Sequence, residues 1–512
     1  EITIGGSLGT APVHGWCSHQ GVAISLPEKG TKLSIKIAAD AQPGLCWIRL
    51  YNAEGASALR PFVIGTLPDV AEKEPNNDIG QAQQLPSTQV VVNGVLSATG
   101  DVDAFAVPLE QGQTVVASID ANHRLGSPMD AVLQVVSARG FVLDQNDDAH
   151  GFDPQISFTA KVKGTYIVRV FAFPAKPNST IRLAGASSYI YRLTLTTGPF
   201  VDHTVPMSLA RSDARSVRLH GWNIPEKLRE LPISVPAEAS KFVVHHAELA
   251  NTLELRIDSH ASVGEHEPNP PKQPEKISLP QTLTGRIDPP GDTDAFAFNA
   301  KKGERLSFHV DSRSLGHPLD AVLVLTDAGG KQLSRNDDQS RGQYDATLDF
   351  TVPQDGVYRV VVSDLFGHGG LRYAYRLTMA AQRADFVLST AADKFVLTVG
   401  QPLKIPVTVT RRRGFGGEIE ITAEGLPEAV SITSIKSILK SKTEKTVELV
   451  LTAAEEVKIE QPFRIVGRSK IDSQSLVRAA SSPLAELTQK TTDFWLTLRK
   501  SEKAKPATEK KP

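Results

Sequence analysis

The stretch that decides the fold class is the Gly-Asp-Val-Asp-Ala-Phe run at residues 100–105, because residues 291–296 repeat it as Gly-Asp-Thr-Asp-Ala-Phe. Three further matches follow in the same order and with nearly the same spacing. They are Asp-Ala-Val-Leu at 130–133 and 320–323, Asn-Asp-Asp at 146–148 and 336–338, and Gly-x-Tyr at 164–166 and 356–358. Chance does not produce this order, so the chain carries two copies of one unit.

Each copy has the apolar periodicity of β-strands. Tyr166, Val168 and Val170 alternate with polar residues, and the same alternation recurs in the second copy. An alternation of period two is typical of half-buried strands. Turn residues separate about seven or eight such runs per copy, without a convincing helical stretch, which predicts antiparallel sandwiches of jelly-roll type.

The length of 512 residues exceeds what one hydrophobic core can serve, and 38 Gly with 33 Pro indicate many turns between short strands. We therefore predict an all-β chain of tandem β-sandwich modules, in which two jelly-roll-like copies alternate with immunoglobulin-like sandwiches. The expected domains are residues 1–69 (Ig-like), 70–198 (first copy), 199–262 (Ig-like spacer), 263–382 (second copy) and 383–499 (Ig-like), followed by a disordered tail at 500–512 rich in Lys, Glu and Pro.

The charges are balanced, with 56 Lys plus Arg against 57 Asp plus Glu, so no global field attracts nucleic acid or an anionic membrane. No apolar run approaches the roughly 18 residues that cross a bilayer, which predicts no membrane insertion. The chain starts at Glu1. We expect a processed or shortened chain from which any export signal could already have been removed.

Cys17 and Cys46 are the two cysteines, and both lie in the first module. A disulfide between them would close a loop worth roughly 3 to 4 kcal/mol in the chain-entropy model and would indicate an oxidising compartment. Two buried free thiols are the alternative, which the spacing alone leaves open.

The motifs of the two copies together resemble the bacterial pre-peptidase C-terminal (PPC) domain, an extracellular β-sandwich appended to secreted proteases and other exported proteins. The resemblance rests on Glu-Pro-Asn-Asn-Asp at 74–78 and on the repeated motifs quoted above. It implies a secreted or cell-surface protein. The alternation with strand-rich spacers resembles large exported proteins of the planctomycete type.

The same resemblance implies a calcium site, because related modules of secreted bacterial collagenases bind calcium through an acidic N-terminal segment and a later Asp pair. Calcium takes six to eight hard oxygen ligands, which must come from separate segments. The candidate ligands of the first copy are Glu72, Glu74, Asn77, Asp78, Asp101 and Asp103. Pro75 leaves the ligand register among residues 76–78 open. Acids and amides that only cap turns are the alternative.

The second copy retains Glu265, Glu267, Asn269, Asp292 and Asp294 as candidate calcium ligands. Pro270 and Pro271 stand where Asn77 and Asp78 stood. If those two residues are ligands, the second copy has lost two oxygens and should bind calcium more weakly.

Other polar motifs favour structural roles. Asn-Asp-Asp at 146–148 with Asp153, and at 336–338 with Asp345, is typical of a tight turn more than of a metal site. The basic run 411–417 fits an exposed hairpin tip better than an anion contact. The sequon at 178–180 is compatible with glycosylation of an exported protein.

No His-Glu-x-x-His helix or Gly-x-Ser-x-Gly elbow is present in the sequence, and the histidines at 245–246 and 266 fit satisfied or exposed positions. We therefore expect a non-enzymatic, calcium-supported structural or adhesive protein that binds a glycan, matrix or protein partner. The alternative is an accessory region of a secreted hydrolase. The sequence does not indicate the oligomeric state.

Overall fold

The computed structural model describes residues 2–3, 11–26, 32–176, 182–211, 213–237, 239, 241–258, 260, 262–455, 457–471, 474–485, 487 and 489–500. The sequon and the expected tail beyond residue 500 lie outside these ranges. The chain forms two compact units. One contains Val63–Gln382, and the other contains Glu1–Phe62 together with Arg383–Pro512. Each unit is described by itself.

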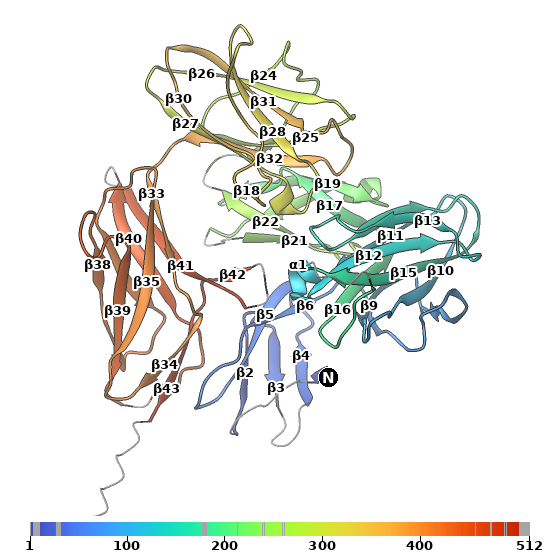
Figure 1. Ribbon diagram of the computed structural model, residues 1–512, viewed down its shortest axis with the longest axis horizontal. Coiled ribbons are helices and arrows are strands. Elements are labelled where there is room, and N and C mark those ends of the chain that lie inside the picture. The colour runs from blue at the N-terminus through green and yellow to red at the C-terminus, as the bar shows by residue number, and fades with distance from the viewer. Residues whose placement is uncertain are drawn as a thin grey trace, which may run out of the picture. The chain divides into compact units, whose positions relative to one another are not determined.

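The described residues are almost entirely β-strands joined by turns, as predicted (Figure 1). The first copy contains β7 (Asp69–Ala71), η1 (Ile79–Gln81), β8 (Gln83–Gln84), β9 (Gln89–Val95), β10 (Asp103–Leu109), β11 (Thr114–Asp120), α1 (Asn122–Leu125), β12 (Met129–Val136), β13 (Val142–Asn146), β14 (Gln155–Thr159), β15 (Gly164–Pro174) and β16 (Ile190–Thr196). They form two sheets with the orders β13-β12-β15-β10-β8 and β14-β11-β16-β9-β7.

The second copy contains β23 (Ser262–Gly264), β24 (Glu275–Lys276), β25 (Gln281–Arg286), β26 (Thr293–Ala300), β27 (Arg305–Asp311), η3 (Arg313–Leu315), β28 (Ala321–Asp327), β29 (Gln332–Asn336), β30 (Thr347–Thr351), β31 (Gly356–Asp364) and β32 (Ala374–Ala381). Its sheet orders are β29-β28-β31-β26-β24 and β30-β27-β32-β25-β23. Strand for strand, this is the order of the first copy.

The core of each copy lies between its two sheets, and one strand shows how it forms. In β10, Phe105 and Val107 alternate with Ala104 and Ala106. The larger pair enters the main core, whereas the two alanines face a smaller cluster that includes Ile79. Burial of a side chain such as Phe or Val contributes about 1.5–3 kcal/mol. Because Asp103 shares the phase of Phe105 and Val107, its carboxylate faces inward at the end of the core.

Between the copies, the spacer forms two three-stranded sheets, β17-β19-β20 and β18-β22-β21. Its elements are β17 (Phe200–Val205), β18 (Ser208–Ala210), β19 (Ala214–Trp222), η2 (Glu226–Leu228), β20 (Glu230–Ser234), β21 (Lys241–Val244) and β22 (Leu253–Asp258). Leu209, Val217 and Leu255 lie in its core.

The other unit combines the beginning of the chain with its end. Its first strands are β1 (Ile2–Thr3), β2 (His14–Cys17), β3 (Val22–Ser25), β4 (Lys32–Ile37), β5 (Gly44–Tyr51) and the first part of β6 (Arg60–Ile64), whose last two residues belong to the Val63–Gln382 unit. The later strands are β33 (Asp385–Ser389), β34 (Lys394–Thr398), β35 (Leu403–Arg412), β36 (Ile419–Glu424), β37 (Val430–Thr433), β38 (Ile435–Ser437), β39 (Thr446–Ala453), β40 (Arg464–Ile471), β41 (Gln474–Pro483), β42 (Lys490–Thr491) and β43 (Trp495–Arg499).

The two cysteines and the basic run 411–417 both lie in this unit, and the structure shows their contacts. Cys17 and Cys46 are free thiols, and the pKa of Cys17 is lowered to about 7, chiefly by a hydrogen bond with Cys46. The two side chains are therefore neighbours in the reduced state, and their disulfide stays a prediction. In the basic run, Arg411 donates to the Gly417 carbonyl at 2.6 Å and lies over the ring of Phe415, which fits the predicted hairpin.

Candidate metal centres

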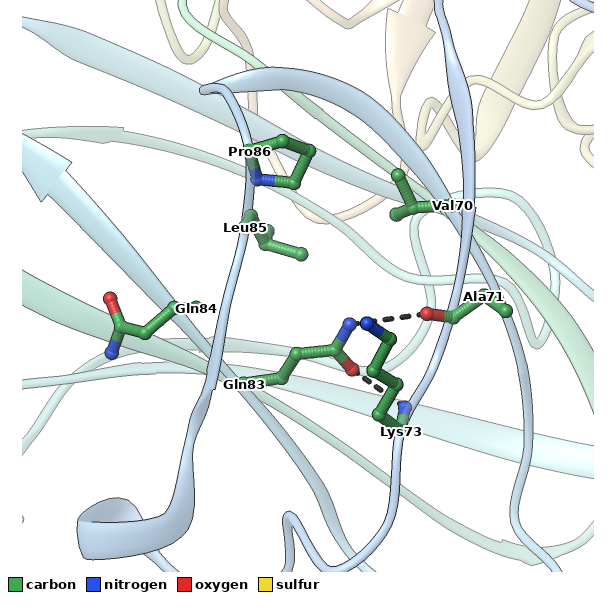
Figure 2. Close-up of a pocket in the computed structure, with 7 residues that line it drawn as sticks. All are labelled: Val70, Ala71, Lys73, Gln83, Gln84, Leu85 and Pro86. Atoms are coloured by element: carbon green, nitrogen blue, oxygen red, sulfur yellow. Dashed lines mark hydrogen bonds between the residues drawn. The ribbon is translucent and has the colours of Figure 1, made fainter.

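In the first copy the backbone fixes the acidic segment that follows β7. This strand pairs in parallel with β9, and the amide of Glu72 continues the pairing by donating to the Asn93 carbonyl at 3.1 Å. Gln83 holds the segment from the other side, because its amide donates to the Ala71 carbonyl at 3.1 Å and accepts from the Lys73 amide at 2.8 Å. Figure 2 shows this bridge across the hollow beside residues 70–73. Hydrogen bonds to Gln83 therefore hold the backbone on both sides of Glu72.

Three of the predicted ligands of the first copy converge. One oxygen from each of Glu74, Asp101 and Asp103 lies within 4.8 Å of the other two. Calcium–oxygen bonds of 2.3–2.6 Å allow two ligands of one ion to lie up to about 5 Å apart. The three carboxylates are therefore spaced as ligands of a single calcium ion would be.

A buried tyrosine joins Glu72 to this group. The Tyr191 hydroxyl lies 2.5 Å from Asp103 Oδ2 and 3.1 Å from Glu72 Oε2. Burial, followed by the contact with Glu72, raises the pKa of Asp103 to about 9, and burial raises the pKa of Glu72. Asp103 therefore holds its proton at neutral pH unless a cation compensates the charge of the cluster.

After Pro75, the residue that lies beside the acidic cluster is Asn76. Asn76 is fully buried, and its backbone amide donates to Glu74 Oε2 at 3.0 Å. Its side-chain amide lies against Glu74 Oε2 and Asp103 Oδ1, at 3.0 and 3.1 Å. Asn77 and Asp78 are exposed instead, and Asp78 precedes η1. The expectation that these two residues join the cluster is corrected in favour of Asn76.

The second copy has a similar trio of Glu265, Glu267 and Asp294, whose oxygens lie within 4.8 Å of one another. In this trio Glu265, the counterpart of Glu72, stands in place of the counterpart of Asp101. The Tyr375 hydroxyl donates to Asp294 Oδ2 at 2.6 Å and lies 3.3 Å from Glu265 Oε2. Burial, followed by the charge of Glu265, raises the pKa of Asp294 to about 10, and burial raises that of Glu265 to about 7. As in the first copy, a buried Asp beside other carboxylates has a raised pKa and holds its proton at neutral pH unless a cation compensates the charge.

Two oxygens of this second cluster are buried without a hydrogen-bond partner. Among the described residues, nothing pairs with Asn269 Oδ1 or Asp294 Oδ1, although their residues are only 1% and 0% exposed. An unsatisfied buried oxygen costs about 1–3 kcal/mol. A cation held between them would remove this cost.

Asn269 is the counterpart of Asn76, so Pro270 and Pro271 replace residues that lie outside the cluster of the first copy. The predicted loss of two ligands in the second copy therefore has no structural basis. Asp292 is not a member of the converging trio, and its two oxygens accept from the amides of Thr293 and Asp288 at 2.8 and 3.2 Å.

The two tyrosines are site residues that the sequence reasoning missed. They belong to a further repeat, Tyr-Ile-Tyr-Arg-Leu at 189–193 and Tyr-Ala-Tyr-Arg-Leu at 373–377, which could have revealed them. Glycine on the neighbouring strand makes room for the ring. A Cβ on Gly285 would lie 2.3 Å from the Tyr375 hydroxyl and 2.6 Å from Glu265 Oε2. The tyrosine, glutamate and glycine are therefore one packed set.

The second acidic motif of each copy has a structural role. The carboxylate of Asp153 accepts hydrogen bonds from the amides of residues 121, 122 and 123 at 2.7–3.1 Å, and so satisfies the beginning of α1. Asp345 accepts from the amides of residues 312–314 at 2.8–3.0 Å in the same manner. These contacts support the structural interpretation of the motif.

Comparison with known proteins gives one family match. Residues 292–364 match the bacterial pre-peptidase C-terminal domain. This segment contains Asp294 and lies within the second copy. A probable subtilase-type serine protease of Deinococcus radiodurans is 44% identical over 75 residues, which cover 14% of this chain and 10% of the protease. The match thus spans about a tenth of that relative.

Two solved structures complete the comparison. The pre-peptidase C-terminal domain of collagenase from Bacillus anthracis is 16% identical, covers 22% of this chain and 99% of its own, and has a TM-score of 0.18. Fibronectin(III)-like modules of CbhA from Clostridium thermocellum are 15% identical, cover 37% and 90%, and have a TM-score of 0.13. No described helix has the length and hydrophobicity needed to cross a membrane.

Proposed function

We propose that this chain is a non-catalytic accessory region of an exported hydrolase, and that calcium stabilises both of its PPC-like copies. The family match at residues 292–364 carries the first part, because a PPC domain is an accessory module of secreted proteases. The segment shared with a subtilase-type protease supports the same assignment. This reading favours our alternative expectation over adhesion.

The calcium part of the proposal rests on the two carboxylate clusters. Each offers three converging carboxylates and a buried Asn, and in the second copy two buried oxygens lack partners. The donor set is all oxygen, which suits calcium and disfavours softer metals. Because a cation must displace the protons that burial places on Asp103 and Asp294, calcium affinity should rise with pH.

We also assign the first copy to the PPC type. The support is its identical strand order and its matching Glu-x-Glu-Pro-Asn segment, Asp pair and tyrosine. The immunoglobulin-like character of the spacers, the domain boundaries, the planctomycete type and the extracellular location stay predictions.

Calorimetric titration of the full chain with calcium tests the cation sites. We expect two sites per chain, with dissociation constants on the order of 0.1–1 mM, as in other extracellular modules. Asp103→Asn should remove one site and Asp294→Asn the other, while Asp78→Ala should leave both. A native chain that takes up no calcium at millimolar concentration would contradict the proposal.

The accessory role is tested by activity and binding together. The purified chain should hydrolyse none of a panel of protein, peptide and glycan substrates. It should bind an insoluble protein or polysaccharide in a sedimentation assay, and removal of calcium should weaken that binding. Turnover of any panel substrate that co-purifies with the chain would refute the non-catalytic assignment.

A further inference from the structure

A second kind of polar cluster lies in the Val63–Gln382 unit, away from the carboxylate sites. It consists of Asp202, His203 and His317, whose ligand atoms lie within 4.8 Å of one another. All three residues are buried, with 6%, 1% and 4% of their surface exposed. Asp202 and His203 come from the spacer, whereas His317 comes from the second copy.

A β-bulge explains how two consecutive residues reach the same point. Successive side chains of a strand normally face opposite sides, but the pairing of β17 with β19 shifts register between Val201 and His203. Asp202 is the extra residue of this bulge. Gly221 on β19 permits the close approach, since a Cβ there would lie 2.1 Å from the Phe200 carbonyl oxygen. The bulge therefore aims Asp202 beside His203.

The third residue is placed by the corner that follows β27. The short helix η3 ends at Leu315 with Gly316 as its C-cap, and the amide of His317 donates back to the Ser312 carbonyl at 3.0 Å. The Asp345 carboxylate holds this corner through the three hydrogen bonds from backbone amides described above. His317 is thus held on a fixed loop facing β17.

The distances fit a zinc-class ion. Asp202 Oδ2 lies 2.9 Å from His203 Nδ1 and 3.7 Å from His317 Nδ1. With bonds of about 2.0–2.1 Å, the ligands of a tetrahedral zinc lie about 3.3–3.4 Å apart. The two observed separations bracket that value, and the ligand nitrogens of the two histidines lie within 4.8 Å of each other.

An unsatisfied nitrogen points into the cluster. Among the described residues, His317 Nδ1 has no hydrogen-bond partner, although it is buried. Neutral imidazole nitrogen is the form that metals bind.

The surroundings orient the carboxylate without occupying the shared oxygen. Arg372 Nε donates to Asp202 Oδ1 at 2.8 Å, so Oδ2 is left to face both imidazoles. Outer hydrogen bonds of this kind fix the direction of metal-ligating carboxylates. The positive charge of Arg372 lowers the affinity for a cation, whereas the charge of Asp202 favours it.

We propose that Asp202, His203 and His317 form a binding site for a divalent transition metal of the zinc class, which joins the spacer to the second copy. Nitrogen and carboxylate ligands select such metals over calcium. This site is independent of the PPC assignment and of the calcium clusters, and metal bound there would stabilise the contact between β17 and the η3 corner.

The first copy supplies the matched substitution. Its Leu-Gly-Ser-Pro at 125–128 aligns with Leu-Gly-His-Pro at 315–318, so Ser127 occupies the place of His317 and is also buried. His317→Ser therefore installs a residue that the same corner already accommodates. His368→Ser, which replaces an exposed histidine of the same copy, is the control.

The experiment loads the full chain with zinc in the presence of excess calcium, dialyses it, and measures bound metal by mass spectrometry. We expect the native chain and His368→Ser to retain about one zinc more than His317→Ser, whose affinity should fall on the order of 100-fold or more. Cobalt in the native chain should show the visible absorption of a tetrahedral nitrogen–oxygen site, and Asp202→Asn should lose it. Equal zinc retention by His317→Ser and the native chain, or a native chain without retained zinc and without the cobalt spectrum, would overturn the proposal.

Discussion

Asp294→Asn should stabilise the second copy when calcium is absent and should abolish its stabilisation by calcium. The side chain is fully buried, and its pKa rises from 3.8 to about 10 through burial and the charge of Glu265. Asn retains an oxygen that can accept from the Tyr375 hydroxyl but carries no titratable proton. The substitution therefore imitates the protonated acid permanently.

The magnitude follows from the proton that folding takes up. Below pH 3.8 the acid is protonated in both the folded and the unfolded state, so it makes no pH-dependent contribution to stability. As pH rises toward the folded pKa of about 10, the unfolded state ionises first, so the native chain loses up to about 1.4 kcal/mol per pH unit. At pH 7 this amounts to as much as about 4 kcal/mol, which Asp294→Asn should recover in chelator.

Calcium should offset much of this difference between the two proteins. At a concentration of about 100 times its dissociation constant, a ligand stabilises the native state by about 2.7 kcal/mol. We expect the native second copy to gain this amount and the variant to gain none. Because both proteins are measured with and without calcium, the effect of the substitution on folding separates from its effect on binding.

The assay is hydrogen exchange by mass spectrometry, at increasing urea, on peptides from β26 and β31. These paired strands report on the second copy alone. Measurements at pH 5, 7 and 8 should show the native chain, in chelator, losing protection as pH rises, and the variant changing much less. If Asp294→Asn is less stable than the native chain in chelator at pH 8, and calcium stabilises both equally, our account of the cluster is wrong.

Three further predictions concern single interactions. Asn76→Ala should remove the calcium site of the first copy in a titration, whereas Asn77→Ala should leave it unchanged; equal effects of the two substitutions would contradict the register. Asp345→Ala should destabilise the second copy by about 3 kcal/mol in urea unfolding, because three hydrogen bonds from backbone amides to a charged group are lost. The calcium affinity of this variant should stay unchanged. Mild oxidation should raise the stability of the unit containing Cys17 by up to about 3–4 kcal/mol, an effect absent from Cys17→Ser and from a chain whose mass shows no loss of two hydrogens.

Local patterns were sufficient to predict much of this protein. The alternation in β10 and β15 and the turns between strands follow from short-range sequence, since a period of two reports directly which side chains face a core. The repeated motifs also located the acidic segments, because two copies of one fold place equivalent residues at equivalent points. Tyr166, Val168 and Val170, whose alternation indicates a strand, lie in the core.

Tertiary structure decided which residues meet. Whether Asn76 or Asn77 faces the cluster depends on the backbone path around Pro75, and the sequence does not contain that direction. Tyr191 reaches Asp103 only because β16 and β10 belong to opposing sheets of one sandwich. Nor does spacing along the chain reveal that residues 1–62 and 383–512 share a compact unit.

The cluster of Asp202, His203 and His317 shows the same division most sharply. Two of its residues are adjacent in sequence, yet in a regular strand they would face opposite sides, and the third lies more than a hundred positions away. A one-residue bulge and a loop from another module bring them together. Contacts of this kind form between residues of different modules when the chain folds. Periodicity therefore determines the strands, whereas only the folded chain determines the sites.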